Sequence, residues 1–163
     1  LTFLEHGLTP NPNSSLLLNN KALSLARLGR TDEAEESLRK ARENASGEEE
    51  ATTILTATDG LIHFRKGEVN QGREKYETAI EQARKGGRIS QEAMALVFLA
   101  REEFDARTEV ADQAIKRAED AVKRVPQNNL DTRITMARLM MAVQKRMEHS
   151  GDTKEVNSTD GAS

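Results

Sequence analysis

The sequence predicts an all-α fold in which antiparallel helix pairs repeat along the chain and one further helix closes the C-terminal end. Charged residues make up 31% of the 163 residues and aromatic residues only 3%, a mixture typical of helices with charged outer faces. The chain has only three prolines. In addition, the stretch LARLGRTDEAEESLRKA at 25–41 recurs in outline as HFRKGEVNQGREKYETA at 63–79, and each consists of two amphipathic segments about a glycine.

The first helix pair is expected over residues 14–46. Apolar residues at helical spacing follow Asn13 and Ser14, either of which can cap the helix start, and Gly29 ends this helix. A second helix begins at Thr31, with acidic residues in its first turn and basic residues near its end, as the helix macrodipole favours. Its apolar face is formed by Ala34, Leu38, Ala41 and Ala45. Small residues on this face let a partner helix approach closely.

The second pair is expected over residues 48–86, where Gly67 separates a helix ending near Lys66 from a return helix over 69–84. A third, divergent hairpin is expected over 90–126, and Pro126 ends it. Its helices carry the apolar stripes Ala93, Val97, Ala100 and Phe104, then Ala111, Ala114, Ala118, Ala121 and Val125. No glycine marks the turn between them, so the register of this hairpin stays open.

The last predicted helix, 129–148, has more apolar surface than one packing contact requires. The stripe expected to pack on the last pair is Leu130, Ile134, Ala137 and Met141, and the residues that broaden it are Met136, Leu139, Met140, Val143 and Met147. Exposed apolar surface marks interfaces, so this capping helix is a candidate surface for homo-oligomer formation or a second partner. Residues 150–163 are polar, and we expect them to be disordered.

Residues at matching positions of the first two pairs carry a family resemblance. The first pair supplies Leu18, Ala22, Leu25, Ala34 and Leu38, and the second supplies Gly60, His63, Gly72 and Tyr76. They resemble the tetratricopeptide repeat pattern W-x2-L-G-x2-Y, A-x3-F and P, which recurs about every 34 residues. Leu4 and Pro12 match the end of a preceding repeat, so residues 1–12 are expected to be the end of a truncated repeat in a longer chain.

The resemblance implies a right-handed α-α superhelix over residues 1–149, whose concave face binds a peptide or a partner helix. The chain is therefore expected to be a protein–protein interaction scaffold. The concave-face positions carried over are Leu16, Asn19, Leu23, Ala26, Arg27, Ile54, Ala57, Leu61, Phe64 and Arg65. The positions with a structural role are Ala22, Gly29, Ala34, Leu38, Gly60, Gly67, Gly72 and Tyr76.

Two alternatives remain open: a regulatory or sensor portion of a larger enzyme or transcriptional regulator, and a nucleic-acid-binding helical repeat. The second is less favoured, because the formal charge is -3 and the Arg and Lys residues at 116, 117, 123 and 124 alternate with acidic residues. The sequence has no cysteine, no phosphate-binding glycine motif and no metal-ligand spacing. We therefore expect no enzyme activity, no cofactor and no metal. No apolar run is long enough to span a membrane, and a cytoplasmic location is expected.

Overall fold

The computed structural model describes residues 14–45 and 47–158, and this part of the chain contains seven helices and no strand. The helices are α2 (Ser15–Arg27), α3 (Thr31–Glu43), α4 (Glu49–Arg65), α5 (Val69–Lys85), α6 (Ile89–Asp105), α7 (Ala111–Arg124) and α8 (Leu130–Ser158). The all-α prediction is confirmed. The predicted end of a truncated repeat, at 1–12, lies outside the described residues.

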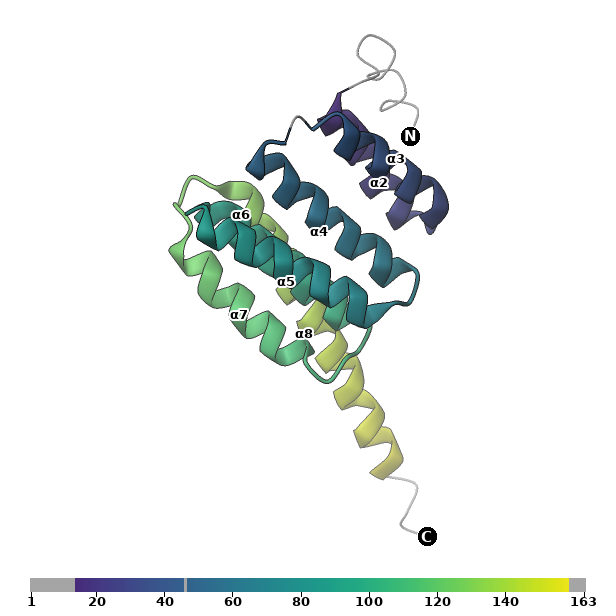
Figure 1. Cartoon of the computed structure of the whole chain (residues 1–163). Helices are drawn as coiled ribbons and strands as arrows, with labels where there is room; N and C mark the ends of the chain where they lie inside the picture. Colours follow the sequence, from purple (N-terminus) through teal and green to yellow (C-terminus); the bar gives the residue numbers. More distant parts are fainter. Residues whose placement is uncertain (1–13, 46, 159–163) are drawn as a thin grey trace.

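Consecutive helices pack as antiparallel pairs, α2 with α3, α4 with α5 and α6 with α7 (Figure 1). Between pairs, α4 contacts α2 and α3, and α6 contacts α4 and α5. Within the described chain, the backbones of α2, α4 and α6 approach one another in series, whereas those of α3, α5 and α7 do not. The first helices of the pairs therefore lie closer together than the second helices, and they form a layer of their own.

The turns inside the three pairs and the turn between α5 and α6 share one backbone geometry. Gly29, Gly67 and Gly87 have φ of 76°, 80° and 66°, and Arg107 has φ of 54°. In each turn the amide of the next residue donates to a carbonyl five positions back, as from Thr108 to Glu103 at 3.1 Å. This is the hydrogen bond of a Schellman motif, which needs a left-handed residue after the helix. The third pair keeps the motif with an arginine, which explains why no glycine marked its turn.

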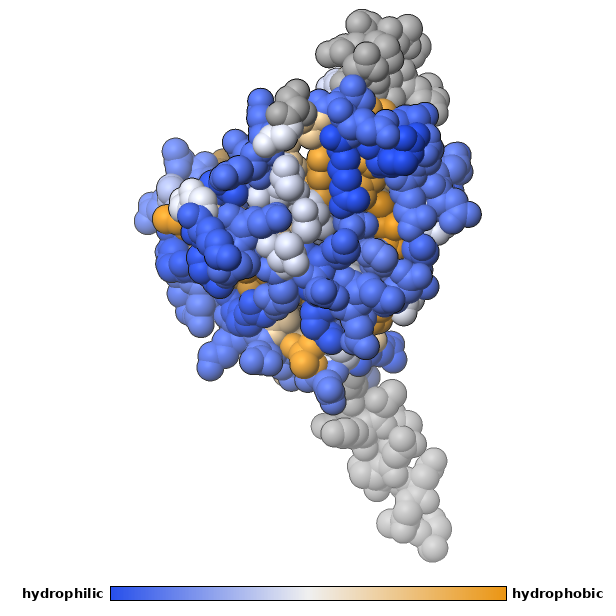
Figure 2. Space-filling view, viewed as in Figure 1, coloured by the Kyte–Doolittle hydropathy of each residue, from blue (hydrophilic) through white to orange (hydrophobic). Residues whose placement is uncertain are grey.

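The core between the helices combines many alanines with larger aliphatic and aromatic side chains. Ala22, Ala34, Ala79, Ala100 and Ala118 are fully buried. Every residue of the two stripes predicted for the third hairpin is also buried. Figure 2 shows that the outer surface over α3, α5 and α7 is covered mostly by hydrophilic residues. The helix pairs are thus held by close helix packing under a polar outer face.

The last helix packs on α6 and α7 through a different face from the predicted one. Met136 and Leu139 are buried, whereas Leu130, Ile134 and Met141 are 62%, 47% and 70% exposed. Ala137 is exposed as well. The predicted packing stripe was therefore wrong, because α8 carries two apolar stripes and periodicity cannot rank them.

The end of α8 also differs from the prediction. The helix continues past the predicted end at 148 to Ser158, and in Figure 1 it extends beyond the helix pairs. The disorder expected for residues 150–163 stays a prediction. No proline stands in this stretch to end the helix. Residues 159–163 lie outside the described part of the chain.

Candidate functional site

An apolar groove with a volume of about 320 Å³ runs across α2, α4 and α6. Leu23 contributes from α2, Ile54 and Ala57 from α4, and Met94 and Phe98 from α6. These side chains are exposed or only partly buried, so they are accessible from solvent. The groove lies on the layer of first helices, the side from which the sequence predicted binding.

Helical spacing explains how these side chains reach the groove. Met94 and Phe98 are four residues apart and therefore lie on one face of α6. The residues just before them, Ala93 and Val97, are 1% and 0% exposed and form the face of α6 that packs in the core. Each first helix thus buries one apolar stripe and turns the adjacent stripe toward the groove.

Buried polar residues lie beneath the groove. The Thr58 hydroxyl donates to the side-chain oxygen of Asn19 at 2.7 Å, which joins α4 to α2. Tyr76 lines the groove from α5 and is 2% exposed. Burial raises the pKa of Tyr76, so the phenol stays protonated and can donate a hydrogen bond.

Polar side chains also line the groove from α6 and from the start of α8. These residues are Ser90, Gln91, Asn129, Asp131 and Thr132. The Gln91 amide donates to Glu50 at 2.8 Å. The groove therefore offers apolar contact along its length and hydrogen-bonding groups beside it, which is the composition of a binding site.

The predicted concave-face residues fall into three groups. Leu23, Ile54 and Ala57 line the groove. Leu16 and Asn19 line a neighbouring hollow of about 220 Å³ between α2 and α4, although Asn19 itself is 3% exposed. The residues not brought to either hollow are Ala26, Arg27, Leu61, Phe64 and Arg65.

Three of these placements correct the prediction. Ala26, Leu61 and Phe64 are 0%, 4% and 8% exposed and belong to the core. They lie on stripes of α2 and α4 that pack against neighbouring helices, so they are not available to a ligand. Arg27 lies at the surface, and Arg65 forms a bidentate ion pair with Glu102.

Sequence reasoning missed Met94, Phe98 and Asp131. The first two lie on the third hairpin, whose register was open, although their spacing of four residues beside the Ala93 and Val97 stripe was a usable signal. Asp131 comes to the groove because α8 packs across α6. No local pattern in the sequence indicates that contact.

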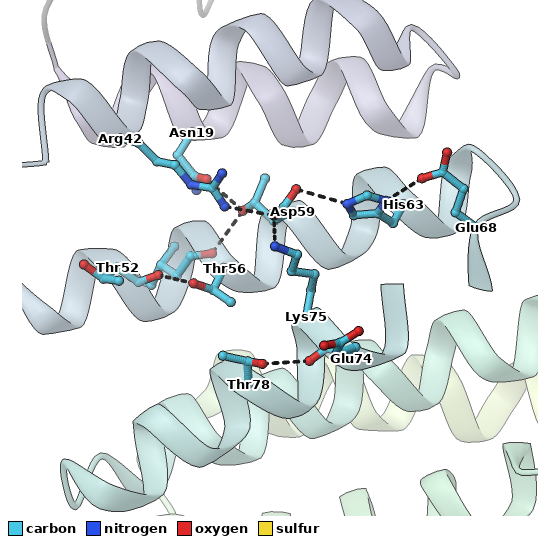
Figure 3. A network of polar contacts seen from close by, with 12 residues as sticks. Asn19, Arg42, Thr52, Thr56, Asp59, His63, Glu68, Glu74, Lys75 and Thr78 are labelled. Carbon is cyan, nitrogen blue, oxygen red and sulfur yellow. Dashed lines mark hydrogen bonds and ion pairs between the residues drawn. The ribbon is translucent and has the colours of Figure 1, made fainter. Parts of the chain in front are cut away.

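A second polar cluster joins α3, α4 and α5 around Asp59 (Figure 3). Its carboxylate lies 3.0 Å from Arg42 and 3.1 Å from Lys75, and His63 lies between Asp59 and Glu68. Burial raises the pKa of Asp59, but hydrogen bonds from Arg42 and Lys75 outweigh it and leave the pKa below its ordinary value. The cluster links three helices through one ionised carboxylate.

Three glutamates of α6 are buried, which the predicted charged outer faces did not suggest. Glu103 is 1% exposed and forms a bidentate ion pair with Arg73. Glu92 lies 3.1 Å from Arg84 and 3.2 Å from Arg124. Burial raises the pKa of the third, Glu102, although Arg65 opposes this shift.

The basic run at the end of α7 is largely engaged within the chain. Arg117 pairs with Glu77, Lys123 with Asp120 and Arg124 with Glu92. These acidic partners reduce the positive charge that a nucleic-acid backbone would meet. The observation weighs against the nucleic-acid alternative.

Comparisons of the chain with protein families, curated proteins and solved structures find no match. Over the residues that the structure describes, no helix has both the length and the apolar character needed to cross a membrane. Over the same residues, no group of three or more His, Asp or Glu side chains could hold a metal ion.

Proposed function

We propose that this protein is a tetratricopeptide-like interaction scaffold that binds an apolar segment of a partner protein in the groove across α2, α4 and α6. The observation that carries the proposal is the accessible apolar lining contributed by all three first helices. In the proposed architecture the helix pairs form a right-handed superhelix, and the groove is its concave face. The resemblance and the groove support the same surface independently.

The groove selects the chemistry of the ligand. A volume of about 320 Å³ holds a few side chains rather than a domain. Ile54, Met94 and Phe98 favour apolar ligand residues, and methionine adapts its shape to different partners. Asp131 and Gln91 beside the groove provide groups for the ligand backbone or for a basic ligand residue. An amphipathic segment with two or three apolar anchors fits this arrangement best.

The test uses random peptides of about twelve residues displayed on phage, a length of roughly three helical turns. Peptides enriched on the immobilised wild-type chain are synthesised, and their affinity is measured by fluorescence anisotropy. We expect enrichment of peptides with apolar residues at helical spacing, and at least about tenfold weaker binding to Ile54→Lys and to Met94→Lys.

Leu28→Lys is the matched control, because Leu28 is 63% exposed and lies in the α2–α3 turn, outside the groove. This variant should bind the peptides as the wild type does. Equal binding by Ile54→Lys and Leu28→Lys, or the absence of any enriched peptide, would refute the proposal. If the chain is the regulatory portion of a larger enzyme or regulator, its ligand would bind in this same groove.

A further inference from the structure

The exposed stripe of α8 has the spacing of a coiled-coil seam. Leu130, Ile134, Ala137 and Met141 are separated by four, three and four residues, the alternation of heptad a and d positions. The opposite face of α8 packs on α6 and α7, so the seam points away from the helix pairs. It spans about 16 Å, or three helical turns.

Charged residues flanking the seam favour one orientation of a partner helix. Ile134 and Met141 take heptad a positions, and Asp131 and Arg138 follow the d positions, which makes them e residues. In an antiparallel pair of identical helices, e residues face e residues. With Leu130 opposite the partner's Met141 and Ile134 opposite the partner's Ala137, Asp131 faces the partner's Arg138. Two-fold symmetry makes this ion pair twice.

A parallel pair is disfavoured by the same residues. In a parallel pair the g residue Arg133 faces the partner's Arg138, so two positive charges meet on each side of the seam. Asp131 and Arg138 are both exposed, and no ion pair among the described residues uses either of them. Their charges are therefore available to a second chain.

We propose that α8 pairs with the α8 of a second copy of this chain, antiparallel and about a two-fold axis, through Leu130, Ile134, Ala137 and Met141. Charge complementarity favours a second copy as the partner, because in the antiparallel arrangement Asp131 of each helix faces Arg138 of the other. None of the four seam residues lines the groove proposed above, although Asp131, which flanks the seam, also lines that groove.

The experiment measures molar mass by sedimentation equilibrium over a wide range of protein concentration. The wild type should change from monomer to dimer as concentration rises. Ile134→Lys and Met141→Lys should remain monomeric, and both should fold, because these side chains are 47% and 70% exposed. Circular dichroism checks that their helix content equals that of the wild type.

Charge reversal tests the orientation. Asp131→Arg and Arg138→Asp each create like charges across the antiparallel seam, so each variant alone should dimerise at least about tenfold more weakly. An equimolar mixture of the two should dimerise as the wild type does, because every pair across the seam is again of opposite charge.

Three results would overturn the proposal. A wild-type chain that stays monomeric at every concentration would assign the seam to a different partner. Dimerisation of Ile134→Lys equal to that of the wild type would place the interface elsewhere. Tighter dimerisation of Arg138→Asp alone would indicate a parallel pair, because that substitution would remove the clash with the partner's Arg133.

Discussion

Gly60 on α4 and Gly72 on α5 face each other where the two helices cross. A Cβ atom on Gly60 would lie 3.0 Å from the Gly72 carbonyl oxygen, and a Cβ atom on Gly72 would lie 2.9 Å from the Gly60 carbonyl oxygen. The same atoms would lie 2.7 Å and 2.5 Å from ring carbons of Tyr76 and Phe64. The two helices therefore pack backbone against backbone, with the rings on either side of the crossing.

Because of this close approach, Gly→Ala substitutions at the crossing should lower the free energy of unfolding, the opposite of their usual effect in a helix. In a helix interior, alanine normally stabilises relative to glycine by about 1 kcal/mol. At Gly60 or Gly72 the added methyl group overpacks the crossing, so we expect each variant to lose about 1–3 kcal/mol of unfolding free energy. Urea unfolding measures the loss. Gln71→Ala, at an exposed neighbouring site of α5, should show almost no loss; stabilisation of Gly60→Ala would contradict the close approach.

The turn between α6 and α7 predicts a stabilising substitution. Arg107 has φ of 54°, a conformation that costs residues with a Cβ atom about 1–2 kcal/mol. Arg107→Gly removes that cost but adds freedom to the unfolded chain, so the net gain should be about 0.5–1 kcal/mol. Gly67→Ala, at φ of 80°, should instead lose stability. Thermal and urea unfolding of both variants test whether the first gains stability and the second loses it.

The buried ion pair between Arg73 and Glu103 predicts that the free energy of unfolding depends strongly on Arg73. Arg73→Ala would leave the Glu103 carboxylate, which is 1% exposed, with the Thr108 hydroxyl at 2.5 Å as its remaining hydrogen-bond donor among the described residues. We expect a loss of about 3–5 kcal/mol, because an unpaired buried charge is costly. The double variant Arg73→Met with Glu103→Leu should recover most of it.

The control for this pair is Arg39→Ala, whose partners Glu36 and Glu43 are exposed, and it should lose less than about 1 kcal/mol. Chemical denaturation at neutral pH measures all three variants. A single Arg73→Ala variant as stable as the double variant would show that Glu103 does not depend on the ion pair.

The cluster around Asp59 predicts how stability changes in acid. Because the pKa of Asp59 is lowered from its ordinary value of 3.8, its contribution is present above that value and is lost as pH falls through the lowered pKa. Asp59→Asn should therefore be less stable than the wild type by about 1–2 kcal/mol at neutral pH. The difference should shrink in acid. Urea unfolding from neutral to acid pH measures it, and a constant difference would contradict the ionised cluster.

The sequence alone determined the helices and the small residues of their packing faces. Gly29 and Gly67 end helices because the left-handed turn residue is a local requirement that glycine meets at low cost. The alanine stripes of α3 and α7 identify their buried faces because helical spacing places those residues on one side. Three of the fourteen residues that line the groove, Leu23, Ile54 and Ala57, followed from the same periodicity together with the resemblance.

Only the tertiary structure decided which of two apolar stripes on a helix is buried. On α8 the buried stripe is the one with Met136 and Leu139, and on α4 Leu61 faces the core while Ile54 faces the groove. It also decided that Glu103 is buried opposite Arg73, a residue 30 positions earlier. These outcomes depend on contacts between helices far apart in the chain. Two apolar stripes of similar area gain nearly the same free energy on burial, so only the position of the neighbouring helix decides which stripe is buried.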